Sequence, residues 1–241
     1  MNKVSKVVGA GLLAGAIMAG PATVEATEVT IGADIASSYV FRGITLNKDA
    51  VIQPSLLAEH ESGFGIEVWA NFDIGDDNGA FEERQFSEVD FVVFYGYDLD
   101  FASVEIGYTE YIEEIGDAFR EGYISLGTGV AGFDVGLTYY QGFQGSDENY
   151  IELSAGYGLE VIEGLEVGIG GHIGWGGKGA TAGGKAGFHD YLVGLSAAYE
   201  VLEGLEVSAF FNYVGSLDSD VLPDDDVRED FVGGLGVYYT F

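Results

Sequence analysis

The chain has no cysteine, little proline and few basic side chains. Its 241 residues include 0 Cys, 3 Pro and 3 His, and only 9 Lys and Arg against 40 Asp and Glu. The lack of cysteine excludes a disulfide framework, a thiolate metal site and a thiol nucleophile. The formal net charge of −31 excludes nucleic-acid binding through phosphate neutralisation, which requires a basic surface. We expect cations, cationic solutes or metal-bridged anionic surfaces as partners, although the acidic bias of a salt-adapted proteome would give the same charge.

Long hydrophobic runs are also absent, apart from one near the N-terminus. Lys3 and Lys6 precede an apolar core, Val7–Ala19, and Pro21 interrupts it before a cleavage site at Ala26. This core is too short to span a membrane, and the order of features is that of a secretory signal. We therefore predict that residues 1–26 are a cleaved signal peptide. No later segment is long and apolar enough for a transmembrane helix, so the exported chain is expected to be periplasmic, secreted or an outer-membrane barrel.

Aromatic residues and glycine are abundant, and apolar residues alternate with polar or small ones. The chain has 39 Gly, 15 Tyr and 16 Phe. The alternation is clearest in the last segment, where one face carries Phe231, Gly233, Leu235, Val237, Tyr239 and Phe241. A period of two that ends on an aromatic residue is typical of a transmembrane β-strand with one side in lipid, and the segment has about the length that a tilted strand needs. The alternative is the final strand of a soluble sandwich.

Twelve such segments can be laid out from Thr27 onward, and the first is predicted to continue from Val29 through Ile35 to Tyr39 and Phe41. Five short turns alternate with six longer polar loops, which a soluble sandwich has no reason to do. Two near-identical turns, Ile162–Val167 and Leu202–Val207, indicate hairpin duplication. We predict an all-β fold over residues 27–241: a single antiparallel transmembrane β-barrel of about 12 strands, with ten or fourteen as the range, short periplasmic turns and long outer loops.

The N-terminal part of this region resembles a known family. Ser38–Ile44, then Gln53-Pro54, Gly63-Phe64 and Val68–Asn71 are similar to the N-terminal signature of the TorF family of exported Gram-negative porin-like proteins. The resemblance covers roughly residues 27–73, and farther along only a general barrel pattern matches. It implies an outer-membrane, porin-like role and names no substrate.

Carboxylates dominate the phase that would face the lumen. If the apolar phase meets lipid, the opposite phase forms the pore lining, and such a lining attracts cations and repels anions. We therefore expect a cation-preferring channel, unless these side chains lie at the water-exposed rims of the barrel or are neutralised by ion pairing with Arg42. The candidate pore-lining residues are Asp34, Arg42, Glu59, Glu67, Asp90, Glu105, Asp134, Glu152, Glu166, Asp190 and Glu206.

Arg42 is the one basic member of this set. We place it on the polar phase of the first strand, two residues from its outer loop, with Gly43 allowing that strand to end. It could cross the pore to an acid and narrow the channel. It could also form a satisfied ion pair that fixes the shape of the barrel, because an unpaired buried guanidinium is costly, and this structural role is favoured.

The sequence offers little support for metal binding or catalysis. Two loops are acidic, one with Asp76, Asp77, Glu82 and Glu83 and the other with Asp218, Asp220, Asp224, Asp225 and Asp226, but neither has the spacing of an EF-hand. No metal and no cofactor is expected. A G-x-S-x-G elbow is absent, and we predict that the protein is not an enzyme. His189 and Asp190 form the only pair worth testing, although neighbouring residues of a regular strand point to opposite faces.

These observations predict an outer-membrane channel for passive diffusion of ions or small solutes. The expected partners are outer-membrane lipid, the permeating solutes and the barrel-assembly machinery, which would recognise the C-terminal strand ending in Phe241. The alternative is a non-conducting structural or adhesive barrel that binds partners or divalent cations through its acidic outer loops.

Overall fold

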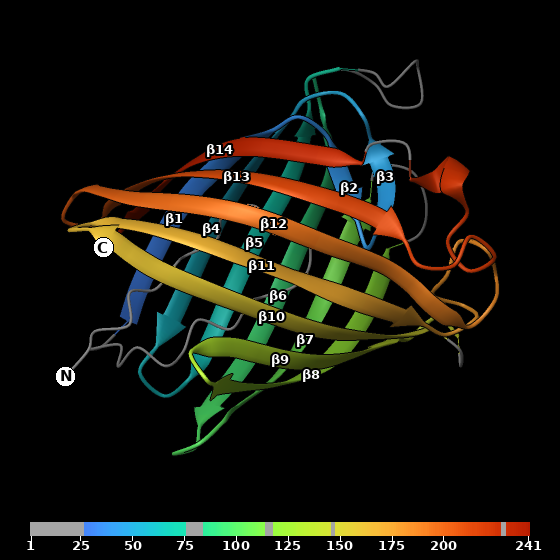
Figure 1. Cartoon of the computed structure of the whole chain (residues 1–241), viewed down its shortest axis with the longest axis horizontal. Coiled ribbons are helices and arrows are strands. Elements are labelled where there is room, and N and C mark those ends of the chain that lie inside the picture. The colour runs from blue at the N-terminus through green and yellow to red at the C-terminus, as the bar shows by residue number, and fades with distance from the viewer. Residues whose placement is uncertain (1–26, 76–83, 114–117, 146–147, 228–229) are drawn as a thin grey trace.

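The computed structural model describes residues 27–75, 84–113, 118–145, 148–227 and 230–241. Twelve strands form one closed antiparallel barrel, and a separate two-stranded hairpin, β2–β3, lies within its loop end (Figure 1). The predicted twelve-stranded barrel is confirmed. The barrel strands are β1 (Thr27–Ala36), β4 (Val51–His60), β5 (Phe64–Asp73), β6 (Phe86–Asp98), β7 (Ser103–Glu113), β8 (Phe119–Val130), β9 (Phe133–Gly142), β10 (Asn149–Ile162), β11 (Leu165–Gly176), β12 (Gly187–Leu202), β13 (Leu205–Ser216) and β14 (Phe231–Thr240).

Closure joins the first strand to the last. β1 pairs with β14 from Thr30–Thr240 to Ala36–Gly234, and on its other edge β1 pairs with β4. The amide of Phe241 also donates to the carbonyl of Val29 at 2.9 Å. Each described barrel strand is therefore paired on both edges, as a bilayer requires, because lipid offers no partner for an unpaired backbone group.

The two faces of the barrel wall differ as the alternation predicts. Large apolar side chains point outward and are exposed, for example Ile35, Leu195 and Leu235, which keep 48%, 57% and 62% of their surface accessible. The next residues along the strands, such as Asp34 and Tyr238, are buried inside. An apolar surface that runs around a whole barrel is the surface expected for contact with lipid.

The connections are sorted by length, as predicted. Short turns link β4–β5, β6–β7, β8–β9, β10–β11 and β12–β13 at one end, where the C-terminus also lies, and the longer loops gather at the other end (Figure 1). The near-identical turns of the sequence are the β10–β11 and β12–β13 turns. Gly164 and Gly204 have the same φ of 78° in them, a left-handed conformation that glycine adopts without steric cost.

The first strand is shorter than predicted. β1 ends at Ala36, and the next residues form the hairpin of β2 (Tyr39–Phe41) and β3 (Ile44–Asn47). The prediction of one strand through Phe41 is wrong. Tyr39 and Phe41 continue the odd-numbered apolar phase of β1, so the alternation hides the point at which the chain turns into the lumen. The stretch from Ile44 onward, which the sequence predicts to be an outer loop, begins with the four residues of strand β3.

Among the described residues, no helix has the length and apolar character to cross a bilayer.

Candidate functional site

The lumen is lined by carboxylates. All ten acidic residues predicted to line the pore lie on the inward phase of their strands, which alternates with the exposed apolar phase. Those nearest the short turns influence one another electrostatically: Glu67 lies within range of Glu59 and Glu105, and Glu206 lies within range of Glu166 and Glu200. This half of the lumen therefore concentrates carboxyl groups close to one another.

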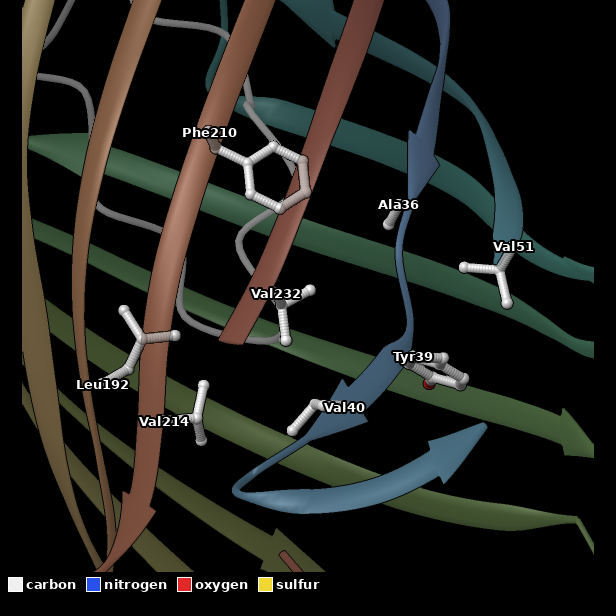
Figure 2. Close-up of a cluster of buried hydrophobic side chains, with 8 residues drawn as sticks. All are labelled: Ala36, Tyr39, Val40, Val51, Leu192, Phe210, Val214 and Val232. Atoms are coloured by element: carbon white, nitrogen blue, oxygen red, sulfur yellow. The ribbon is translucent and has the colours of Figure 1, made fainter. Parts of the chain in front are cut away.

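The β2–β3 hairpin occupies the other half of the lumen, toward the long loops. Its Val40 is 1% exposed and belongs to an apolar cluster with residues of the inner wall, drawn in Figure 2. Inward-facing residues would normally be polar in a water-filled channel, but four of them on β12, β13 and β14 are apolar and form a seat for the hairpin. We call this group the apolar seat; its wall residues are Leu192, Phe210, Val214 and Val232.

The tip of the hairpin is a two-residue turn, Arg42-Gly43. Both residues have positive φ, 47° and 79°, as in the mirror-image turns that suit hairpins. Gly43 lies so close to the wall that a Cβ there would be 2.6 Å from Cβ of Asp190 and 2.7 Å from Cδ2 of Leu222. An arginine in this conformation is uncommon, so its side-chain contacts must compensate for a backbone that glycine or asparagine would adopt more readily.

The Arg42 guanidinium reaches across the lumen to β8. Its Nη2 and Nη1 donate to the two carboxylate oxygens of Glu121 at 2.6 and 3.1 Å, and the two side chains are 8% and 1% exposed. Its Cζ also lies 4.5 Å from the ring centres of Tyr140 and Tyr150 and 4.7 Å from that of Phe41. A bidentate pair flanked by three rings is a strong arrangement for a planar cation.

A second group of polar side chains surrounds Asp190 beneath the hairpin tip. Its Oδ1 accepts a hydrogen bond from the Tyr150 hydroxyl at 2.7 Å and lies 2.9 Å from Nδ1 of His189. Its Oδ2 lies 2.9 Å from Nε2 of His172, whose Nδ1 is 3.8 Å from Oε2 of Glu152. Asp190 is fully buried and has three hydrogen-bonding neighbours. It therefore fixes the position of Tyr150 and forms part of the wall against which Gly43 lies.

Two further contacts fix the base of the hairpin. The Tyr39 hydroxyl donates to Oε2 of Glu88 at 2.7 Å, and its ring packs against Trp69 with ring centres 5.5 Å apart. Asn47 donates to Oδ1 of Asp73 at 2.6 Å. The hairpin is thus anchored to β5 and β6 near its base and to β8 and β12 at its tip. It therefore spans the lumen from one side to the other.

The loops between β11 and β12 and between β13 and β14 cover the hairpin tip. The amide of Gly183 donates to the carbonyl of Val221 at 2.9 Å, and Leu222 is completely buried against Gly43. On the outside, Lys185 pairs with Asp220 at 2.7 Å, and this hydrogen bond and charge lower the pKa of the exposed Asp220 carboxyl. The second loop also contains a 3-10 turn, Asp224–Asp226.

The sequence of the chain matches one family over most of its length. That family is described as "Bacterial protein of unknown function (Gcw_chp)", and the match runs over residues 19–222. The chain belongs to the Gcw_chp family. No curated protein matches it by sequence.

Solved outer-membrane porins share the fold of this Gcw_chp chain. The KdgM porin in complex with disordered oligogalacturonate has a TM-score of 0.57 and 11% identity, covering 89% of this chain and 99% of its own. The NanC porin has a TM-score of 0.55 and 13% identity, with the same two coverages. An outer-membrane channel from Pseudomonas putida F1 has a TM-score of 0.55 and 12% identity, covering 89% of this chain and 94% of its own. At these identities the similarity shows a common barrel architecture.

The Gcw_chp structure corrects the placement of Arg42. The residue is not on a barrel strand; it is the first turn residue of the hairpin, and Gly43 is the second turn residue rather than the end of a strand. Its partner, Glu121, is absent from the residues predicted to line the pore. Glu121 shares the inward phase of β8 with Tyr123 and Ser125, but it precedes the clear alternation that starts at Ile124, so the local pattern does not assign it to the strand.

The expectation that His189 and Asp190 point to opposite faces is also wrong. The β11–β12 register shifts between Ile173 and Trp175, so Phe188 and Tyr191 take consecutive outward positions and both residues between them turn inward. Such a bulge re-aims side chains next to it. The two residues are both fully buried and in contact.

Metal binding by the acidic loops has no support in the part of the chain that the structure describes. Across residues 27–75, 84–113, 118–145, 148–227 and 230–241, no group of three or more His, Asp or Glu side chains is arranged to hold a metal ion. The loop with Asp218, Asp220 and Asp224–Asp226 lies within this part. The other acidic loop, with Asp76, Asp77, Glu82 and Glu83, lies outside the described residues.

Proposed function

We propose that the protein is a porin-like channel of the bacterial outer membrane for passive diffusion of ions or small solutes, with a preference for cations. The observation that carries this proposal is the contrast between the two faces of one closed barrel: exposed Ile, Leu, Val and aromatic side chains outside, and carboxylates inside. An apolar exterior suits lipid, and an acidic interior suits water and cations. The resemblance of Ser38–Ile44 to the TorF family supports the same role and stays a prediction.

Export and assembly follow from this proposal. A cleaved signal over residues 1–26, which lie outside the described part, would deliver the chain to the periplasm. The barrel-assembly machinery would then recognise β14, which ends next to the exposed aromatic Phe241. Outer-membrane lipid is the proposed partner of the exterior.

Cation preference rests on the inward carboxylates. Basic side chains that could offset them are scarce, and the Arg42 guanidinium is already paired with Glu121 and packed against three rings. KdgM has been solved with oligogalacturonate, an acidic oligosaccharide. We propose that the channel described here takes solutes of the opposite charge, because a polyanion would meet repulsion along this lumen.

The test is the reversal potential of the refolded mature chain in a planar bilayer under a KCl gradient. Discrete current steps with a cation-selective reversal potential are expected. Replacing Glu67 and Glu105 together with glutamine should reduce the selectivity, and replacing the outward-facing Glu110 with glutamine serves as the control. Anion selectivity in the unmodified chain would refute the cation preference.

One observation favours the alternative of a non-conducting barrel. The hairpin spans the lumen and is anchored at both its base and its tip, so it could block passage completely. The barrel would then act through its outer loops. A correctly folded barrel that gives no current steps, with or without the hairpin, would support this alternative and reject the channel.

We propose no enzymatic role. The contact of 2.9 Å between Nδ1 of His60 and Oγ of Ser62 joins two exposed residues of one turn. His172 and His189 both face the buried Asp190 beneath the hairpin. The first is a turn contact, because the same Nδ1 also accepts a hydrogen bond from the amide of Ser62 at 3.1 Å, and the second is buried away from solvent.

A further inference from the structure

The surroundings of the Arg42 guanidinium form a binding site for a planar cation. One carboxylate accepts two parallel hydrogen bonds, and aromatic rings lie above and beside the cation. In the part of the chain that the structure describes, every cation–ring contact belongs to Arg42. We call this site the cage; its wall residues are Tyr111, Glu121, Tyr140 and Tyr150.

The cage is held in place without the hairpin. The Tyr111 hydroxyl donates to Oε1 of Glu121 at 2.7 Å, which orients the carboxylate from the neighbouring strand β7. The Tyr150 hydroxyl donates to Asp190 at 2.7 Å, and the rings of Tyr140 and Tyr150 pack with centres 6.1 Å apart. All of these residues belong to the barrel wall, so the wall keeps a preformed cage when Arg42 is withdrawn. Of the ring contacts, only that of Phe41 leaves with the hairpin.

The geometry selects one class of ligand. A flat cation with two parallel N–H groups fits a carboxylate bidentately and also presents its face to rings. A hydrated inorganic cation does neither, and a compact ammonium group cannot make the two parallel hydrogen bonds. The cage therefore matches the guanidinium group specifically rather than positive charge in general.

We propose that the cage is a binding site for small guanidinium-bearing solutes, occupied from within the chain by Arg42, so that such a solute displaces Arg42 and releases the hairpin from the lumen. The binding step stands on the cage alone. The opening step rests on the proposed channel function. In this step, guanidinium compounds both trigger the opening of the channel and permeate it.

Competition between the tethered and the free cation determines what can be measured. Arg42 is attached to the chain and so has a high effective concentration at the cage, which a dissolved competitor must exceed. The Tm of the unmodified chain should consequently change little with guanidinium, and the Tm of a chain without the Arg42 side chain should change clearly.

The experiment uses Arg42→Asn in the full mature chain, because asparagine tolerates the left-handed turn conformation. Millimolar guanidinium chloride should raise the Tm of this variant by several degrees relative to equimolar KCl, since a ligand that binds only the folded state stabilises it. The rise should vanish in the double variant Arg42→Asn, Glu121→Gln. A matched control is Arg120→Asn, which removes the exposed partner of Glu110 and should show no guanidinium-specific rise. Equal effects of guanidinium and potassium would overturn the proposal.

If Arg42→Asn does not fold, the unmodified chain provides the measurement. Hydrogen exchange of residues 39–47 should accelerate several-fold in guanidinium chloride compared with KCl at the same ionic strength, because released hairpin amides lose their partners. Exchange that is equally slow in both salts would reject displacement.

Bilayer recordings separate this proposal from the channel itself. A conductance that increases when guanidinium replaces potassium supports both. A barrel that conducts potassium but shows no guanidinium-specific stabilisation retains the channel and rejects the cage. A barrel that binds guanidinium but never conducts retains the cage and rejects the channel.

Discussion

At the scale of single residues, Arg42 combines a strained backbone with a buried charge. Both are unfavourable alone, and both are offset by contacts that the rest of the chain supplies: the Glu121 carboxylate and three rings. A second ion pair, Arg120 with Glu110, has a similar N–O distance of 3.1 Å but lies on the outer side of the wall. The Arg42 pair is buried, bidentate and flanked by rings, whereas the Arg120 pair is exposed and uses one carboxylate oxygen, so the two represent a strong and a weak ion pair of one chain.

Glu121→Gln should therefore be far more damaging than Glu110→Gln. The first leaves a buried guanidinium without a counter-charge, which costs about 3–5 kcal/mol. The second removes a solvent-accessible pair of about 0.2–1 kcal/mol. Urea unfolding of the two variants in detergent measures the difference, and equal midpoints would mean that Arg42 is not held by Glu121.

Gly43→Ala should destabilise the docked hairpin by about 1–3 kcal/mol for the left-handed conformation, and by more for the overlap with Asp190 and Leu222. Gly184→Ala is the control that separates the two causes. Gly184 also has a positive φ, 64°, but nothing lies within 4 Å of the position that a Cβ would take there. Thermal unfolding should show a larger loss for Gly43→Ala; equal losses would show that close packing at the tip contributes nothing.

At the scale of elements, the hairpin and the barrel are separable. β1 pairs directly with β4, and Ala36 lies opposite Val51, so the barrel wall is continuous without the residues between them. Without the hairpin, the apolar seat loses its packing partner, and Glu88 and Glu121 of the wall lose the side chains that bind them.

Replacing residues 38–49 with a short Gly-Ser loop should leave a folded barrel with a wider passage. We expect an unchanged β-sheet circular dichroism spectrum and a single-channel conductance that increases several-fold, because the obstruction at the loop end is gone. A control that shortens the β9–β10 loop instead should not change the conductance. An unchanged conductance after hairpin removal would show that the lumen is limited elsewhere.

At the scale of the whole molecule, the charge of the lumen acts through water and salt. The separation at which charges influence an ion falls from about 10 Å in 0.1 M salt to about 3 Å in 1 M salt. The ratio of cation to anion permeability should therefore decline steeply between these concentrations. Reversal potentials at fixed gradient and rising mean concentration measure it, and a ratio that does not change would point to selectivity by contact at a narrow site.

The barrel could be predicted well from the sequence because a membrane imposes a strict rule on each strand. Lipid on one side forces apolar residues into every second position, so strands such as β14 can be recognised locally. The hairpin obeys no such rule. Tyr39 and Phe41 happen to continue the phase of β1, and only the inward turn at residues 37–38 separates them from it.

The candidate site could be predicted only in part for a related reason. The inward carboxylates follow from strand phase, whereas the pairing of Arg42 with Glu121 joins positions 79 apart across the lumen. Nothing local in the chain indicates that contact. The apolar seat left a weak signal, since Phe210 and Val214 are apolar residues on the phase of β13 that also carries Ser208 and Asn212.

The apolar seat also sets an order of events. Val40 is synthesised early, but the surfaces that receive it belong to β12, β13 and β14, the last strands to be made. The barrel itself closes through a pair such as Asp34 and Tyr238, 204 positions apart. Contacts so distant along the chain form late, because the intervening loop must first be closed. The hairpin is therefore among the first segments to be synthesised, and we expect it to dock only after the barrel has closed around an open lumen.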